Sequence, residues 1–110
     1  MYLTDPDRVE VMGEFGGLGL PLKGHVWQDS DNWGYVQYKN EKEVTDRYVE
    51  IADGLLEMVK KGVAAGVYTQ TTDCEIEVNG LMTYDRKVIK IEENRVREAN
   101  LKLCHSLDNE

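Results

Sequence analysis

The amino-acid sequence predicts an α/β fold with parallel strands, and three observations carry that prediction. Two apolar runs with the character of strands occur at residues 9–14 and 63–69. Each run is followed by a long polar or glycine-rich loop, and each loop by an amphipathic helix. Strands that alternate with helices are typical of parallel sheets, in which ligands bind at the carboxyl ends of the strands.

The first expected strand, residues 9–14, reads Val-Glu-Val-Met-Gly-Glu and ends before the pair Gly16-Gly17. An irregular segment then extends to Asn40 and carries Trp27 and Trp33 among several glycines. Loops of this length are uncommon inside a compact domain and are usually functional. We therefore expect the segment after the first strand to contribute to a binding surface.

The first expected helix is the clearest element. Asn40 suits the N-cap position, with Glu43 three residues later, and Gly62 suits the residue after the helix. Between them, apolar side chains recur at spacings of three and four residues: Val44, Tyr48, Ile51, Leu55 and Met58. This spacing predicts a helix that packs one face on a core.

The second expected strand, residues 63–69, is apolar without alternation. This pattern predicts a strand that is covered on both faces. A polar loop follows, and a second amphipathic helix is expected over residues 92–106, with an inner face of Val96, Ala99 and Leu103. Two strands and two helices cannot close a barrel, and open parallel edges tend to pair with other chains. We therefore expect either the remainder of a larger enzyme or other copies of the chain to cover these edges.

Composition and charge exclude several classes of partner and cofactor. Hydrophobic residues make up 41% and charged residues 31%, which is typical of a globular protein, and no apolar run is long enough to span a bilayer. The net charge of -8 disfavours nucleic acid as a partner. The two cysteines, Cys74 and Cys104, have no metal-ligand spacing, and nucleotide-binding motifs are absent, so we expect no cofactor and no metal. Composition leaves the compartment open.

Several residues are candidates for chemistry. Glu14 would project from the carboxyl end of a parallel strand, although position alone favours an ordinary solvated glutamate. Trp27 and Trp33 could stack on sugar rings or could equally fix the long loop to the protein, and His25 is expected to be a hydrogen-bonding loop residue. The polar groups of the second loop, including Gln70 and Asp73, could bind hydroxyls or could stabilise the loop itself.

The sequence also resembles a known family. Residues 11–21 read Val-Met-Gly-Glu-Phe-Gly-Gly-Leu-Gly-Leu-Pro, residues 67–73 read Val-Tyr-Thr-Gln-Thr-Thr-Asp, and residues 77–86 read Glu-Val-Asn-Gly-Leu-Met-Thr-Tyr-Asp-Arg. These strings resemble the C-terminal part of the catalytic (β/α)8 barrel in glycoside hydrolase family two, the β-galactosidase and β-glucuronidase-like enzymes. The resemblance covers residues 9–107.

The resemblance implies a partial TIM barrel in which residues 1–110 are a C-terminal fragment with two β-α units, corresponding to barrel strands seven and eight. It implies that Glu14 is the nucleophile and that Trp27, Trp33, Tyr68, Gln70 and Asp73 contact a carbohydrate substrate. The acid/base of the family is a glutamate in an Asn-Glu pair, and Asn40-Glu41 begins a helix instead. Ile76 replaces the glycine usual in this branch, which could alter the second loop.

The expected function follows from the chemistry of retaining glycosidases, which place two carboxyl groups about 5–5.5 Å apart across the scissile bond. Glu14 could serve only as the nucleophile, so we expect this chain to form part of a β-galactosidase-like hydrolase and to be inactive by itself. General acid catalysis is typically worth about 10²–10⁴-fold. The alternative is a non-catalytic α/β module that self-associates and retains at most residual carbohydrate binding.

Overall fold

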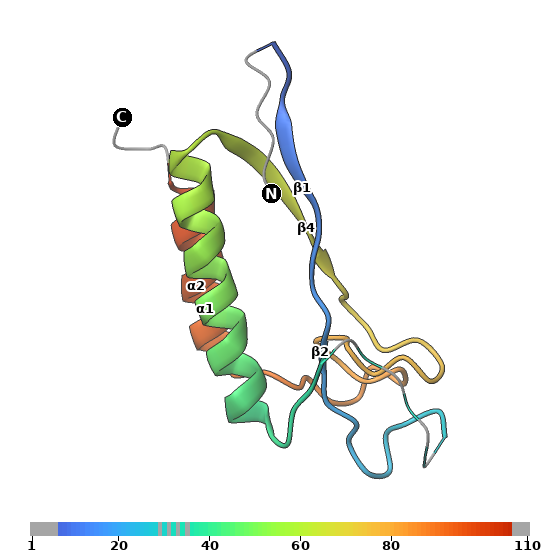
Figure 1. The fold of residues 1–110 in the computed structure, drawn as a ribbon. Coiled ribbons are helices and arrows are strands. Elements are labelled where there is room, and N and C mark those ends of the chain that lie inside the picture. Colours follow the sequence, from blue (N-terminus) through green and yellow to red (C-terminus); the bar gives the residue numbers. More distant parts are fainter. Residues whose placement is uncertain (1–6, 29, 31, 33, 35, 107–110) are drawn as a thin grey trace.

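The structure is a computed structural model that describes residues 7–28, 30, 32, 34 and 36–106. It is a small mixed α/β fold with two helices and few strands, all parallel (Figure 1). The elements in chain order are β1 (Glu10–Gly16), β2 (Leu18–Gly19), β3 (Val36–Gln37), α1 (Glu41–Lys60), β4 (Val63–Thr69) and α2 (Glu93–Cys104). The predicted α/β class and the parallel strands are confirmed.

The main sheet pairs β1 with β4 in parallel. Its register aligns Met12 with Gly66, Phe15 with Tyr68 and Gly16 with Thr69. Irregularities between residues 10 and 11 and between residues 12 and 15 interrupt the pairing, as bulges do next to functional sites in many sheets. The predicted strand 63–69 is confirmed without change, whereas the first strand extends two residues beyond the predicted end at Glu14.

A second, minimal sheet lies in the segment that the sequence predicts to be irregular. β2 pairs in parallel with β3, and the Tyr38 N–H donates to the Gly19 carbonyl at 2.6 Å. Two-residue strands are too short to leave a periodic pattern in a sequence. Their pairing folds the long loop back onto the end of β1.

Both helix predictions are confirmed within a few residues. The Asn40 side chain accepts a hydrogen bond from the Glu43 N–H at 2.9 Å, as an N-cap does. The Glu43 carboxylate accepts in turn from the Lys39 N–H at 2.8 Å. Gly62 follows α1 with φ +114°, a left-handed conformation in which a side chain would be strained.

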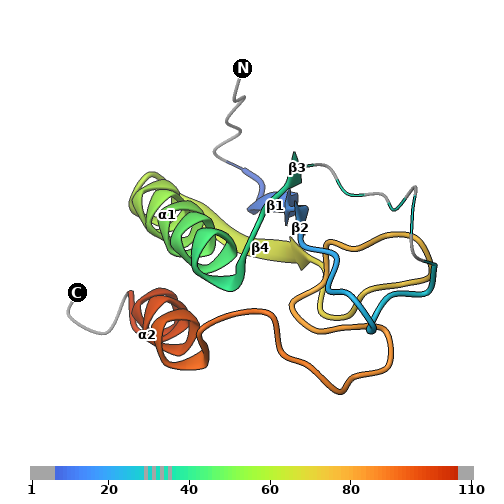
Figure 2. The ribbon, with the colours of Figure 1, turned by 90° about the horizontal axis from the view of Figure 1, so that it is seen from below.

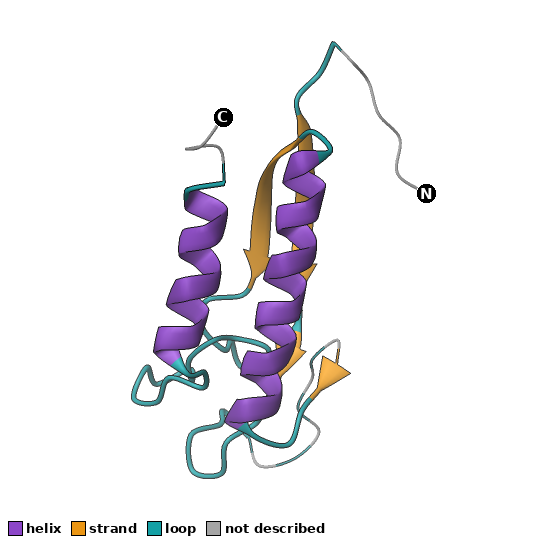
Figure 3. Ribbon diagram, turned by 90° about the vertical axis from the view of Figure 1, so that its left-hand side faces the viewer, coloured by secondary structure: helices purple, strands orange, loops and turns teal. Residues whose placement is uncertain are grey.

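The two helices form one layer and the β1–β4 sheet forms the other. Figure 3 shows both helices in front of the two strands, and Figure 2 shows the long loops gathered on the other side of the sheet from the helices. The loops extend from the carboxyl ends of β1 and β4, which lie together because the strands are parallel. The described part of the chain therefore concentrates its loops at one end of the sheet.

The core lies between the helices and the start of the long loops. Its buried members come from β2, α1, α2 and the segments beside them: Leu18, Leu20, Val44, Tyr48, Ala52, Ile91, Val96 and Ala99. Val96 and Ala99 were predicted to face inward on α2, and they do; Leu103 packs against the cluster while partly exposed. No residue of β1 or β4 belongs to the buried cluster, although Tyr68 packs against it.

The prediction that β4 is covered on both faces is wrong. Val63 is buried, but residues 64–67 are exposed, and Val67 retains 54% of its accessible surface. The reason is that the described residues supply helices for only one face and supply no strand beyond β1 or β4. An apolar strand is thus left in contact with solvent.

No helix among the described residues has the length and apolar character that a membrane span requires.

Candidate active site

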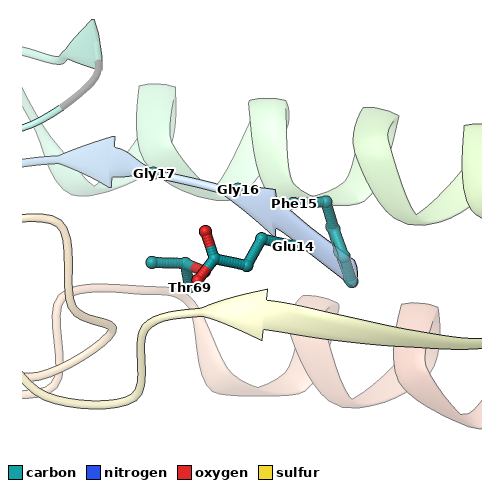
Figure 4. A pocket seen from close by; sticks show the side chains of 5 residues that line it. All are labelled: Glu14, Phe15, Gly16, Gly17 and Thr69. Atoms are coloured by element: carbon teal, nitrogen blue, oxygen red, sulfur yellow. The ribbon is translucent and has the colours of Figure 1, made fainter. Parts of the chain in front are cut away.

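Glu14 lies on β1, close to its carboxyl end, and its side chain is exposed. It lines a shallow pocket of about 220 Å³ together with Phe15, Gly16, Gly17 and Thr69 (Figure 4). Figure 4 shows the Glu14 carboxylate reaching across toward Thr69 at the end of β4. Glu14 is the one acidic residue among these lining residues.

The two glycines after Glu14 have left-handed backbone conformations, with φ +107° at Gly16 and φ +75° at Gly17. A Cβ at Gly16 would lie 2.5 Å from the Tyr68 ring and 2.9 Å from the Thr69 carbonyl oxygen. Gly16 is therefore needed for a close approach of β1 to β4. The neighbour that a side chain at Gly16 would meet first is the Tyr68 ring.

Tyr68 is partly buried beside the pocket. Its ring packs edge-on against Phe15, with centroids 5.4 Å apart, and tilted against Tyr48 at 5.0 Å. Burial, with smaller contributions from Tyr48 and Tyr38, raises the pKa of Tyr68 well above its usual range. The hydroxyl is buried and finds no hydrogen-bond partner among the described residues. Its predicted contact with substrate stays a prediction.

Gln70 begins the loop after β4, and the peptide bond between Thr69 and Gln70 is cis. The side-chain amide of Gln70 donates to Asn79 Oδ1 at 2.6 Å, so a hydrogen bond joins the start of this loop to its middle. Asn79 is fully buried, and its Nδ2 has no partner among the described residues. Gln70 is partly exposed, which leaves its predicted role in substrate binding open to test.

Asp73 is buried in an ion pair. Lys90 Nζ donates to Asp73 Oδ1 at 2.7 Å, to the Leu20 carbonyl at 2.7 Å and to the Val78 carbonyl at 3.0 Å. Burial raises the pKa of Asp73 and lowers the pKa of Lys90, while the contact between them acts against both shifts. The structure thus places Asp73 inside the loop, joined to both strand-end loops through one ammonium group.

Gly80 completes this buried arrangement. Its N–H donates to Asp73 Oδ1 at 2.8 Å, and a Cβ there would clash with the Asp73 backbone nitrogen. Sequence reasoning missed both Gly80 and Lys90. The signal for Lys90 was present, because it is the one charged residue in the run Val88-Ile89-Lys90-Ile91, where a lysine needs a buried partner.

The predicted aromatic contacts separate into two cases. Trp27 is 59% exposed and meets the Tyr84 ring edge-on at 5.7 Å, whereas Trp33 lies outside the described residues. The His25 Nδ1–H donates to Asp85 Oδ2 at 2.9 Å, which confirms His25 as a hydrogen-bonding loop residue. The ion pair that Asp85 forms among the described residues is with His25.

The geometry offers an exposed carboxylate near the carboxyl end of β1, a close approach of β1 to β4 at Gly16, and two loops joined through Lys90. Among the described residues, no group of three or more His, Cys, Asp or Glu side chains could hold a metal ion. Comparison of the sequence with protein-family models and with curated proteins finds no match.

Proposed function

We propose that this chain carries the nucleophile half of a retaining β-glycosidase active site, with Glu14 as the nucleophile. The observation that carries the proposal is the exposed Glu14 carboxylate in a pocket at the carboxyl end of a parallel strand, where enzymes with parallel sheets bind substrates. The resemblance to glycoside hydrolase family two supports the same residue in the same role.

The proposed fold extends the observed one. β1 and β4, with α1 and α2, correspond to the seventh and eighth β-α units of a TIM barrel, whose remaining units would cover the exposed residues of β4. The exposure of residues 64–67 supports this, because strands inside a barrel are apolar on both faces. The second carboxyl group would then come from a segment outside residues 1–110.

In this mechanism Glu14 attacks the anomeric carbon of a β-glycoside and displaces the leaving-group oxygen, which takes a proton from the second carboxyl group. A covalent glycosyl-enzyme ester forms, and water then releases the sugar with its original anomeric configuration. Because the pocket around Glu14 has a single carboxylate, hydrolysis of ordinary glycosides by the isolated chain is expected to be negligible.

Covalent trapping tests the proposal. The chain is incubated with 2-fluoro glycosides whose activated leaving groups depart without protonation, and the adduct is located by mass spectrometry. We expect label on Glu14 in the wild type and in Glu10→Gln, a matched change on the same strand, and no label in Glu14→Gln. If the intact enzyme that contains this sequence is labelled at another carboxylate, Glu14 is not the nucleophile.

A second candidate function is a self-associating, non-catalytic α/β module. The exposed apolar surface of β1 and β4, including Val11 at 53% and Val67 at 54%, favours it, because such strands pair with other copies. Light scattering tests the idea directly. A stable monomer of 12.6 kDa that remains folded would reject required association.

A further inference from the structure

An open apolar groove runs between α2 and the loop that precedes it. The groove has a volume of about 360 Å³ and is lined mainly by apolar side chains: Leu81, Met82, Ile89, Ile91, Val96 and Leu101. Ile89 of the loop is 44% exposed, and Leu101 of the helix is 41% exposed. Large apolar side chains that gather in one open groove indicate a surface for another protein segment.

The groove lies on the side of α2 that faces away from α1. Arg95 marks the side toward α1, because its Nη1 lies 2.7 Å from Asp46 Oδ1 of that helix. Glu93 and Arg97 line the groove, and each is two residues from Arg95, which is about 200° around the helix. Figure 3 shows α1 on one side of α2 and no described helix on the other.

Two opposite charges flank the apolar part of the groove. Glu93 and Arg97 are exposed, and neither side chain forms an ion pair or a hydrogen bond with a described residue. By contrast, Arg95 and Glu92 at the same end of α2 pair at 2.8 Å. Glu93 and Arg97 are four residues apart and so share one face of the helix. Their charges are therefore available to a partner that docks in the groove.

We propose that this groove is the interface of a symmetric dimer, in which α2 of one copy lies antiparallel to α2 of a second copy. A two-fold axis between Glu93 and Arg97 places the carboxylate of each copy opposite the guanidinium of the other. The same axis brings Leu101 of each copy toward Ile89 of the other, because these residues follow and precede Arg95 by six positions. Parallel helices would instead bring like charges together, so the charges select the antiparallel arrangement.

This interface is distinct from the Glu14 pocket and from the open sheet. None of the residues that line the groove belongs to β1 or β4, and none lines the pocket of Glu14. The dimer therefore leaves that pocket accessible, and the inference does not depend on the role of Glu14. Because α2 has 12 residues and is about 18 Å long, the contact is small beside a standard interface of about 800 Å² per partner, and we expect reversible association.

The test is analytical ultracentrifugation of the full chain from about 1 μM to about 1 mM, at about 0.15 M salt to screen the net charge of -8 on each copy. We expect the mass to rise from 12.6 kDa to twice that value. Glu93→Arg and Arg97→Glu, which place like charges across the interface, should each raise the dissociation constant about tenfold or more. Since these two variants carry complementary charges, their equimolar mixture should form a mixed dimer with an affinity close to that of the wild type.

The controls separate this interface from other contacts. Glu98→Arg and Lys102→Glu make the same charge changes at exposed positions of α2 outside the groove, and they should leave the dissociation constant unchanged. Circular dichroism checks that every variant is folded. A chain that stays monomeric throughout the series would overturn the proposal, as would a mixture of the two charge variants that fails to associate. A dimer that Val67→Asp disrupts and the α2 variants do not would be formed by the sheet and would also overturn it.

Discussion

The loop that spans residues 70–91 and the β1–β4 sheet from which it extends differ in how far the described residues cover them. The loop encloses a buried lysine with three oxygen acceptors and a fully buried asparagine and threonine. The sheet exposes most of β4 and leaves the Tyr68 hydroxyl without a partner among the described residues. A segment without regular structure is thus better enclosed than the regular one.

The difference shows which part of the fold is stabilised by contacts within this chain. Buried charges need partners, and the loop pairs its buried ammonium, Lys90, with its buried carboxylate, Asp73, although Asn79 Nδ2 has no partner among the described residues. An apolar parallel strand needs cover on two faces, and the described residues cover one. Substitutions in the loop should therefore destabilise the folded chain strongly, whereas substitutions on the open side of the sheet should have little effect on it.

Removing the buried ammonium should give the largest effect. Lys90→Met removes the counter-charge of the buried Asp73 carboxylate and one donor to each of two carbonyls, and breaking a buried ion pair in this way costs about 3–5 kcal/mol of unfolding free energy. Urea denaturation followed by circular dichroism measures it. The control is Lys87→Met, an exposed lysine of the same loop, which should change stability by less than about 0.5 kcal/mol. Equal effects of the two changes would show that the loop is not held by Lys90.

Two valines of β4 differ strongly in burial, so they test within one strand how burial affects stability. Val63 is 3% exposed and Val67 is 54% exposed. Val63→Ala should cost about 2 kcal/mol of unfolding free energy, because it removes two buried methyl groups and leaves a cavity. Val67→Ala should stay within about 0.5 kcal/mol. A large loss in Val67→Ala that depends on protein concentration would show instead that other copies of the chain cover the sheet.

Tyr48 and Tyr68 differ in whether the buried part of the side chain includes a hydrogen-bonded hydroxyl. The Tyr48 hydroxyl donates to Asn100 Oδ1 at 2.6 Å and joins α1 to α2, whereas the buried Tyr68 hydroxyl has no partner among the described residues. Tyr48→Phe should lower the unfolding free energy by about 1 kcal/mol. Tyr68→Phe should be neutral or stabilising in the same denaturation experiment. The reverse order would mean that Tyr68 acquires a partner in solution.

The contact between His25 and Asp85 should respond to acid. Hydrogen bonds from Thr83 and His25 lower the pKa of Asp85 to about 2, below the usual value of about 3.9. A lowered carboxyl pKa stabilises the fold above pH about 4, and that stabilisation is lost as the pH falls through about 2. NMR signals of Trp27 and Tyr84 should shift in this window, and Asp85→Asn should abolish the transition. A transition centred at higher pH would assign it to another group.

The sequence predicted the regular elements well because each has its own local signal. Asn40 caps α1 and Gly62 ends it, as their residue types favour. The parallel pairing followed from the alternation of strands and helices. The cover of β4 was predicted wrongly, because an apolar run reports what a strand needs and not whether the described residues of the same chain provide it.

The candidate site was less accessible to sequence reasoning. Glu14 was placed correctly at a strand end, since strand, glycines and acid are consecutive. The pairs Lys90–Asp73 and His25–Asp85 join residues 17 and 60 positions apart, and no local pattern encodes such distances. The two-residue strands β2 and β3, which fold the loop after β1 back on itself, likewise carry no periodicity.

The most direct test of the central claim is the site of covalent label after treatment with an activated 2-fluoro glycoside. Trypsin should release residues 9–23 as one peptide that contains both Glu10 and Glu14. The expected result is an added sugar on Glu14. Label on Glu10 or on another peptide, with Glu14 unlabelled, would contradict the role of Glu14.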